Sequence, residues 1–298
     1  MPRSRPIPFK GIVALLRPKQ WTKNLACLSG AFFAGHIRNP HIAGRGLLAV
    51  LAFCATASLV YVLNDIVDRE QDRNHPRKKS RPIASGEVTV FQGILLAVVL
   101  LVLAVAIAAP LGANVLALLA GYVVMNCAYS FALKHVPVLD GMILALGFIL
   151  RIYVGTEAAG VLPSAWILLC TLFLSLFLAF GKRRAELNTL GAEAASTRTV
   201  IQQYNVTMLD RLCNICATLV IATYALFTVL SHPDHSLILT TPPVVFGLFR
   251  YLLLVEREEV GEAPDVVLLT DRPIQLAILV WFSLYVAVLY FGLRIHVQ

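Results

Sequence analysis

Nine apolar segments, each near the length needed to cross a bilayer, constrain this chain more than any other feature. A bilayer-spanning helix needs about 20 predominantly apolar residues, and no polar stretch between the segments exceeds about 30 residues. Hydrophobic residues make up 58% of the 298 and charged residues only 14%, whereas soluble domains have about 45–50% and about 25%. The sequence therefore excludes an ordinary soluble enzyme. It predicts an all-α polytopic membrane protein of one domain, residues 1–298, with nine transmembrane helices in one bundle at 22–37, 45–65, 88–109, 111–133, 139–160, 164–182, 210–230, 237–255 and 274–295.

Two of these segments depart from a regular span. The first is short and follows an amphipathic stretch. The eighth contains Pro242 and Pro243, and proline removes a backbone donor and clashes with the preceding turn. We therefore expect the eighth helix to be kinked or shortened.

Positive charge predicts the orientation. With nine spans and the N-terminus inside, 21 of the 25 Lys and Arg residues lie in the cytoplasmic segments, as the positive-inside rule requires. The C-terminus is then outside. Acidic residues gather on the same side, although they obey no such rule, so a cytoplasmic polar site in the cell inner (plasma) membrane is indicated.

The first charged constellation follows the second apolar segment. Asp65, Asp68 and Asp72 are spaced i, i+3, i+7 and fall within about 60° of one helix face. Three carboxylates on one face repel one another unless a cation lies among them, and oxygen ligands favour Mg²⁺. The alternative is a solvated helix end with Arg69 and Arg73 as partners.

A basic loop follows at residues 73–86, which read RNHPRKKSRPIASG. Arg73, Lys78 and Arg81 are its candidate phosphate ligands, because cations hold phosphate oxygens while carboxylates hold the metal. Both a ligand role and a loop-structure role are open for His75. The pair of features indicates a site for a magnesium diphosphate.

These residues resemble a known signature. Asn64-Asp65-x-x-Asp68-x-x-x-Asp72 followed by RPIASG at 81–86 is similar to the motif of the UbiA membrane prenyltransferase superfamily. The resemblance implies nine transmembrane helices and a cytoplasm-facing Mg²⁺-dependent diphosphate site. Within that site, Asn64, Asp65, Asp68 and Asp72 would hold the metal and the leaving diphosphate, with Asp65 and Asp68 counted as catalytic.

The end of the sixth segment departs from the typical family pattern. Residues 180–187 read FGKRRAEL, where typical members carry a second aspartate-rich motif. A second carboxylate-held metal is therefore not expected, and a second anionic group is. We predict catalytic roles for Lys182 and Glu186 and substrate binding by Arg183; a positive-inside anchor at a helix end is the alternative for these cations.

This departure resembles the decaprenyl-phosphate phosphoribosyltransferase branch of the superfamily. Further matches are RPKQWTKN at 17–24, YSFALKH at 129–135, Arg151, GEAPD at 261–265 and Asp271-Arg272. The branch implies 5-phosphoribosyl diphosphate as donor, a polyprenyl (decaprenyl-type) phosphate as acceptor, and a product that feeds arabinose-donor synthesis for cell-wall arabinosylation or for nodulation signals. The sequence favours neither pathway.

Five further residues are candidates for either substrate phosphate. They are Lys19, Lys23, Asn24, Lys134 and Arg151. Arg151 lies within an apolar span, where charges are costly and usually functional. Its alternative role is a tie to a backbone carbonyl or to Asp140.

Two other functions are alternatives to phosphoribosyl transfer. A UbiA-type prenyltransferase acting on an aromatic or other acceptor would use the same first motif, and the missing second acidic motif argues against it. A metal or proton transporter would place charges at mid-span, whereas nearly all charges here lie at one face. The partners predicted are the two substrates, Mg²⁺ and the bilayer, with no nucleic acid; a homo-oligomer is compatible with the sequence.

Overall fold

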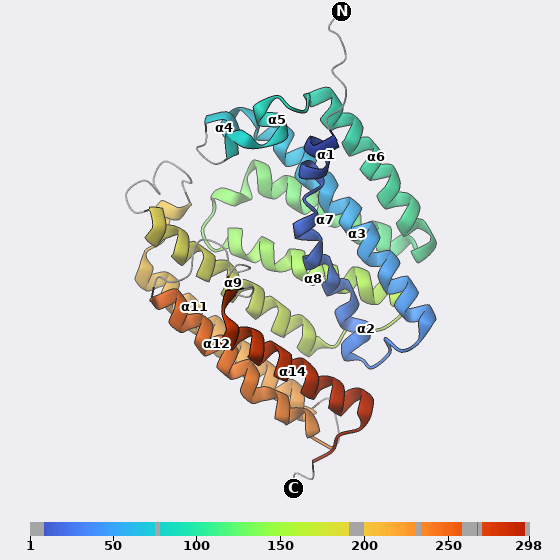
Figure 1. The fold of residues 1–298 in the computed structure, drawn as a ribbon, viewed down its shortest axis with the longest axis vertical. Helices are drawn as coiled ribbons and strands as arrows, with labels where there is room; N and C mark the ends of the chain where they lie inside the picture. Colours follow the sequence, from blue (N-terminus) through green and yellow to red (C-terminus); the bar gives the residue numbers. More distant parts are fainter. Residues whose placement is uncertain are drawn as a thin grey trace, which may run out of the picture. The chain divides into compact units, whose positions relative to one another are not determined.

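The computed structural model describes residues 9–74, 78–190, 200–230, 234–257, 267 and 270–295. Within these ranges the regular structure is helical throughout, which confirms the all-α prediction (Figure 1). His75 and the 261–265 motif lie outside the described residues.

The chain forms two compact units. The first comprises Met1–Ala132 with Leu150–Pro163, and the second Leu133–Ile149 with Ser164–Gln298. Helix α8 (Leu139–Ala159) contributes to both. The other elements of the first unit are α1 (Phe9–Leu16), η1 (Pro18–Leu28), α2 (Ser29–Phe33), α3 (Pro40–Val67), α4 (Arg69–Asn74), η2 (Lys78–Ser80), α5 (Pro82–Ser85), α6 (Val90–Ala108), η3 (Ala109–Leu111) and α7 (Ala113–Phe131).

The second unit begins with the short 3₁₀ helix η4 (Leu133–His135), which leads into α8. Its remaining elements are α9 (Ala165–Leu190), η6 (Ile201–Gln203), α11 (Val206–Leu230), η7 (Ser236–Thr240), α12 (Thr241–Glu256) and α14 (Arg272–Phe291). Helices α9 and α11 pack along each other, as do α12 and α14.

Eight helices in the described part of the chain are long and apolar enough to cross a membrane. They coincide with eight of the nine predicted segments. The exception is 22–37, whose residues lie mainly in η1 and the five-residue α2. Polar residues such as Lys23 and Asn24 interrupt this segment, and the chain turns at Gly35 with φ 76°.

Helix starts follow local sequence chemistry. Thr89 and Gln92 form a reciprocal capping box at α6, and the Asp271 carboxylate caps α14 by accepting from the Ile274 N–H. Pro242 and Pro243 fall in the first turn of α12, where a missing N–H costs little. The predicted irregularity is therefore a short α12 preceded by the separate turn η7.

Each unit has its own apolar core. In the first unit, Phe53 of α3 packs against Tyr122 of α7 with ring centroids 4.7 Å apart. In the second, Phe177 of α9 packs against Tyr251 of α12 at 5.1 Å. Of the charged residues described next, Asp65 lies on α3 and Arg183 on α9, so packing of these cores fixes where their side chains lie.

Candidate functional site

Two buried carboxylates lie near the junction of α3 and α4. Asp65 lies in the last turns of α3, and Asp72 lies on α4, which starts directly after Asp68. Both residues are only 2% exposed. A buried carboxylate needs cationic or hydrogen-bonding partners to offset its lost hydration.

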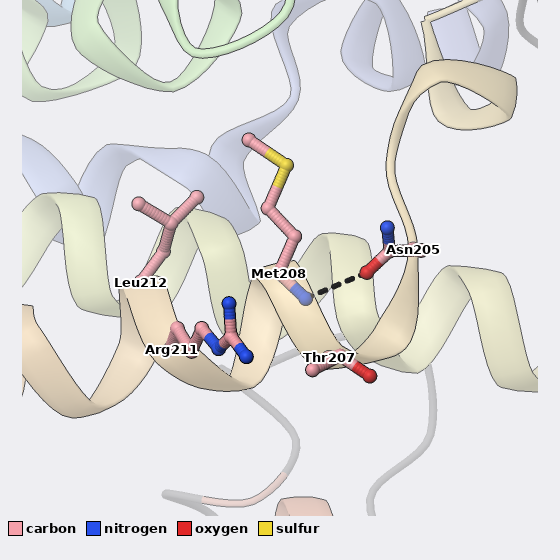
Figure 2. Close-up of a pocket in the computed structure, with 5 residues that line it drawn as sticks. All are labelled: Asn205, Thr207, Met208, Arg211 and Leu212. Atoms are coloured by element: carbon pink, nitrogen blue, oxygen red, sulfur yellow. Dashed lines mark hydrogen bonds between the residues drawn. The ribbon is translucent and has the colours of Figure 1, made fainter.

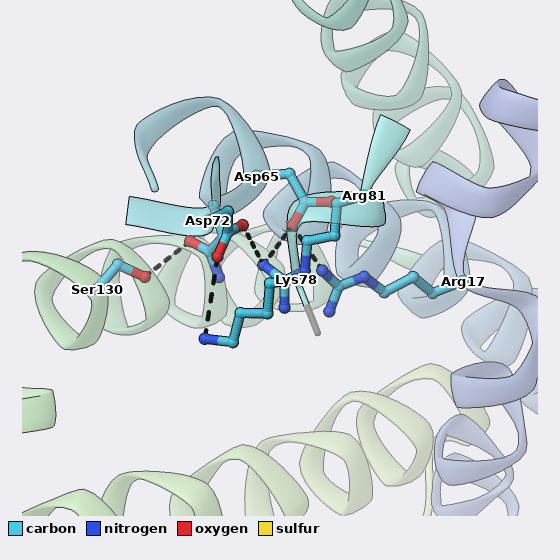
Figure 3. A network of polar contacts seen from close by, with 7 residues as sticks. Arg17, Asp65, Asp72, Lys78, Arg81 and Ser130 are labelled. Carbon is cyan, nitrogen blue, oxygen red and sulfur yellow. Dashed lines mark hydrogen bonds and ion pairs between the residues drawn. The ribbon is translucent and has the colours of Figure 1, made fainter. Parts of the chain in front are cut away.

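Three cations supply those partners, as Figure 3 shows. Arg81 Nη1 donates to Asp65 Oδ1 at 3.0 Å and to Asp72 Oδ2 at 2.6 Å. Arg17 Nη2 donates to Asp65 Oδ1 at 2.6 Å, and Lys78 Nζ lies 3.9 Å from Asp72 Oδ1. Three cations thus surround two buried carboxylates, and we call this group the carboxylate cluster.

The RPIASG motif places Arg81 by its backbone. Arg81 is the N-cap of α5, and Gly86 ends that helix with φ 81°, a left-handed conformation that glycine adopts without strain. Arg73 Nε donates to the Ala84 carbonyl at 3.1 Å, which fastens the motif to α4. Arg73, predicted to bind phosphate, therefore has a loop-fastening contact and also pairs with Glu70.

The remaining members of the acidic motif have other surroundings. Asp68 is the half-buried C-cap of α3, and Asn64 Oδ1 accepts from the Ser130 hydroxyl at 2.7 Å. Among the described residues, no three His, Cys, Asp or Glu side chains are arranged as ligands of one metal ion. Asp65 and Asp72, which share one arginine nitrogen, nonetheless fit Mg²⁺, because this ion commonly uses one or two carboxylates plus substrate phosphates.

Arg17 was not among the predicted site residues. It has a left-handed backbone, φ 51°, directly before Pro18, and its guanidinium lies over the Tyr61 ring, 4.8 Å from the centroid. The ring and Asp65 together fix its direction. The only sequence signal was its place at the start of the RPKQWTKN match, 48 positions from its carboxylate partner.

Arg151 and Asn24 meet inside the first unit. Arg151 Nε donates to Asn24 Oδ1 at 2.9 Å, and the guanidinium lies over the Phe53 ring at 4.7 Å and the Tyr122 ring at 5.2 Å. Arg151 is 5% exposed. These contacts tie η1 to α8, which gives Arg151 and Asn24 a packing role. Their binding of substrate stays a prediction.

A glycine in α8 allows η1 to approach that helix closely enough for this contact. A Cβ on Gly155, one helical turn after Arg151, would overlap the carbonyl oxygen of Cys27. Small residues of this kind allow close helix approach in membranes. Lys19 and Lys23 of η1 are exposed, and their predicted phosphate role remains a prediction.

A second charged cluster lies in the second unit, at the end of α9. Arg183 Nε donates to Asp140 Oδ2 at 2.8 Å and its Nη1 to Glu186 Oε2 at 2.7 Å. Lys182 Nζ lies 3.9 Å from Glu186 Oε1. Arg183 is 4% exposed, whereas the Lys182 side chain is 44% exposed, so Lys182 is the more accessible cation of the two.

The same cluster contains Tyr204, which the sequence reasoning missed. Its hydroxyl donates to Asp140 Oδ1 at 2.9 Å and accepts from the Val138 N–H. Burial raises the pKa of Tyr204 to about 12, so the hydroxyl keeps its proton at neutral pH. Lys134, another predicted phosphate ligand, is half-buried in η4, four residues before Val138.

Arg184 differs from its neighbours on α9. Its Nε donates to Asp210 at 2.9 Å and its Nη1 to the Val255 carbonyl at 2.7 Å. Arg184 therefore ties α9 to α11 and α12.

A cavity of about 410 Å³ opens beside the first turns of α11 (Figure 2). Asn205, Thr207, Met208, Arg211 and Leu212 line it. The Asn205 side chain caps the helix by accepting from the Met208 N–H at 2.7 Å. None of the predicted site residues lines this cavity.

Comparison with known proteins places this geometry in context. The UbiA prenyltransferase family model matches residues 24–270. The chain is 35% identical over 289 residues to the decaprenyl-phosphate phosphoribosyltransferase of Corynebacterium glutamicum, covering 94% of this chain and 87% of the relative. It is 32% identical over 189 residues to the nodulation protein NoeC of Azorhizobium caulinodans, covering 63% of this chain and 61% of NoeC.

Among solved structures, a UbiA homologue from Archaeoglobus fulgidus bound to DMAPP and Mg²⁺ has a similar fold. The TM-score is 0.71 at 19% sequence identity, over 93% of this chain and 98% of the archaeal chain. At this identity the likeness establishes the fold alone.

Proposed function

Because the chain belongs to the UbiA prenyltransferase family, we propose that it transfers the 5-phosphoribosyl group of 5-phosphoribosyl diphosphate to a polyprenyl phosphate of the decaprenyl type. A phosphate oxygen of the acceptor forms a bond to C1 of the ribose. The bond from C1 to the diphosphate oxygen breaks, and diphosphate leaves with the bonding electrons. The product, a lipid-linked phosphoribose, would feed arabinose-donor synthesis.

One observation carries the choice of donor. At the end of α9, both Glu186 and the neighbouring Asp140 of α8 are already bonded to Arg183, and Glu186 lies near Lys182. This position therefore offers an exposed cation in place of a second pair of metal-binding acids. A donor with a diphosphate at C1 and a phosphate at C5 has the additional anion that such a cation would bind.

In the first unit, the carboxylate cluster would hold the diphosphate end of the donor. Asp65 and Asp72, with Asp68 beside them, would bind Mg²⁺, which supplies charge neutralisation of the diphosphate. Arg81, Arg17 and Lys78 would bind phosphate oxygens, since guanidinium groups pair with phosphate in a bidentate manner. Asn64, predicted to hold the metal and the diphosphate together with these aspartates, would be oriented by the hydrogen bond that its Oδ1 accepts from Ser130.

The acceptor needs little activation by protein groups. A phosphate monoester has its second pKa near about 6, so it is largely dianionic at neutral pH. A single displacement at C1 then inverts the α-diphosphate to a β-linked product. Lys182 would bind donor phosphate, so Lys182→Met should raise the KM for the donor or lower kcat.

The decisive experiment uses purified protein, Mg²⁺ and polyprenyl phosphate with donor labelled in the ribose. Transfer of label to the lipid fraction, with a β-linked product, is expected. Transfer only of a prenyl group from a polyprenyl diphosphate to an aromatic acceptor would refute the proposal in favour of prenyl transfer. An α-linked product or a ribosyl-protein adduct would refute the single displacement alone.

We also propose that the carboxylate cluster faces the cytoplasm of the inner (plasma) membrane. The supporting observation is the concentration of Lys and Arg in the segments on that side. A cysteine introduced by Lys79→Cys should react only with a membrane-permeant reagent in intact cells, and one introduced by Asp234→Cys should react with an impermeant reagent. The reverse pattern would contradict this orientation.

A further inference from the structure

The backbone turns sharply between η4 and α8, at Val138. This residue has φ 69°, a left-handed conformation that is a genuine outlier for a β-branched residue. Such residues persist only where the surroundings hold them, and they gather at functional sites. The segment Leu133–Asp140, which we name the Val138 corner, therefore needs a group that holds it.

Tyr204 is that group. Its hydroxyl accepts from the Val138 N–H and donates to Asp140 Oδ1 at 2.9 Å. Tyr204 and Asp140 are both buried. Tyr204, 64 positions along the chain from Asp140, thus bonds both the strained residue and the first turn of α8.

Asp140 extends this link to the end of α9. Its other oxygen, Oδ2, accepts from Arg183 Nε at 2.8 Å. Arg183 in turn donates to Glu186, which lies 3.9 Å from the Lys182 ammonium group. One buried series of contacts therefore runs from the Val138 corner, which carries Lys134, to the exposed Lys182.

We propose that Tyr204 and Asp140 are positioning residues that hold the Val138 corner and so set the positions of Lys134 and Lys182 for substrate phosphate. This rests on the proposed function, because it takes those two lysines as donor ligands. Neither Tyr204 nor Asp140 touches the reacting atoms. Their effect is to keep a strained backbone in the conformation that substrate binding requires.

The test compares Tyr204→Phe, Val138→Gly and the double variant. Tyr204→Phe keeps the ring and removes both hydroxyl contacts, so the KM for 5-phosphoribosyl diphosphate should rise about tenfold, with kcat changed less. Glycine adopts positive φ without strain. Val138→Gly should therefore be close to wild type alone, and in the double variant it should return KM to within about threefold of wild type.

Hydrogen–deuterium exchange provides a readout that does not depend on activity. The amides of Asp140 and Met142 bond the carbonyls of Val136 and Val138 at 3.1 and 2.9 Å. Their exchange should speed up in Tyr204→Phe and slow again in the double variant. If the wild-type protein transferred no ribose, the proposed function would fail, while exchange would still decide whether Tyr204 holds the corner.

Tyr224→Phe is the matched control. The Tyr224 hydroxyl is also buried and bonded in the second unit, to Thr240 at 2.6 Å and Trp281 at 2.7 Å. Its loss should lower thermal stability without changing KM or exchange at the corner. Should Tyr204→Phe fail to fold, the proposal requires Val138→Gly to restore folding in the double variant.

Two results would overturn the proposal. One is an unchanged KM and unchanged exchange in a folded Tyr204→Phe protein. The other is a double variant as impaired as Tyr204→Phe, because the hydroxyl would then act in some way other than by holding Val138.

Discussion

Replacing Arg81 should lower the stability of the metal-free protein and increase the stabilisation that Mg²⁺ provides. Arg81 Nη1 bridges Asp65 and Asp72 at 3.0 and 2.6 Å. Hydrogen bonds to charged groups contribute about 1.5–3 kcal/mol each, and removing one partner of a fully buried ion pair costs about 3–5 kcal/mol. Because the Arg81 side chain is 27% exposed and Arg17 remains on Asp65, we expect Arg81→Gln to lower the free energy of unfolding by about 2 kcal/mol.

The response to Mg²⁺ should change in the opposite direction. Arg81 and a metal ion would use the same carboxylate oxygens, so removing the arginine removes a competitor. If the binding free energy of Mg²⁺ improved by the same amount as the free energy of unfolding falls, about 2 kcal/mol, the dissociation constant for Mg²⁺ alone would fall by about 30-fold. The stabilisation by a given Mg²⁺ concentration would rise accordingly.

Thermal unfolding of purified protein in detergent, with chelator and with a Mg²⁺ titration, measures both effects. Lys79→Gln is the control, because it removes one positive charge from an exposed position in η2. It should change neither the stability in chelator nor the stabilisation by Mg²⁺ appreciably. An Arg81→Gln protein with wild-type stability in chelator, and with no larger Mg²⁺ shift, would show that the arginine and the metal do not share these carboxylates.

Three further outcomes are expected. Asp68→Ala should abolish phosphoribosyl transfer while the thermal midpoint stays near wild type, and activity within about threefold of wild type would remove Asp68 from the metal ligands. Gly155→Ala should destabilise the protein by about 1–3 kcal/mol, since its Cβ would meet the Cys27 carbonyl; denaturation would detect this, and Gly121→Ala, which has open space, should be neutral. Hydrogen bonding from an α12 arginine holds the pKa of Asp271 below its usual value, so its stabilising effect is present above about pH 4 and lost as pH falls through the lowered pKa. Stability against pH should therefore separate wild type from Asp271→Asn at neutral pH and bring them together in acid.

The sequence predicted most of the spans because long apolar segments admit few alternatives. Eight helices in the described residues match predicted segments. The segment 22–37 was predicted as a span from its apolar residues, but its residues lie mainly in η1 and the short α2. Asn24 is buried against Arg151. The local sequence pattern around either residue does not predict this contact.

The site was predictable where partners are close in sequence. Glu186 lies one turn from Lys182 and Arg183, and the structure brings the three together. Tyr204 was missed, and Asp140 was considered only as an alternative partner of Arg151. Asp140 bonds Arg183, 43 positions away, and Tyr204, 64 positions away. Spacing on one helix reveals the first kind of contact, and only the tertiary fold reveals the second.

The contact between Asn24 and Arg151 has a consequence for how the chain assembles as it is made. Synthesis proceeds from the N-terminus, so Arg17 and Asp65, 48 positions apart, are both available early. Asn24 must wait for a residue 127 positions further on. A ribosome-bound chain that ends after α7 therefore has both partners of the Arg17–Asp65 ion pair but lacks the Arg151 guanidinium. Because Trp21 already donates to Ser58 and Asn24 to Cys54 of α3, η1 can be held early on one side, and its contact with α8 is completed last.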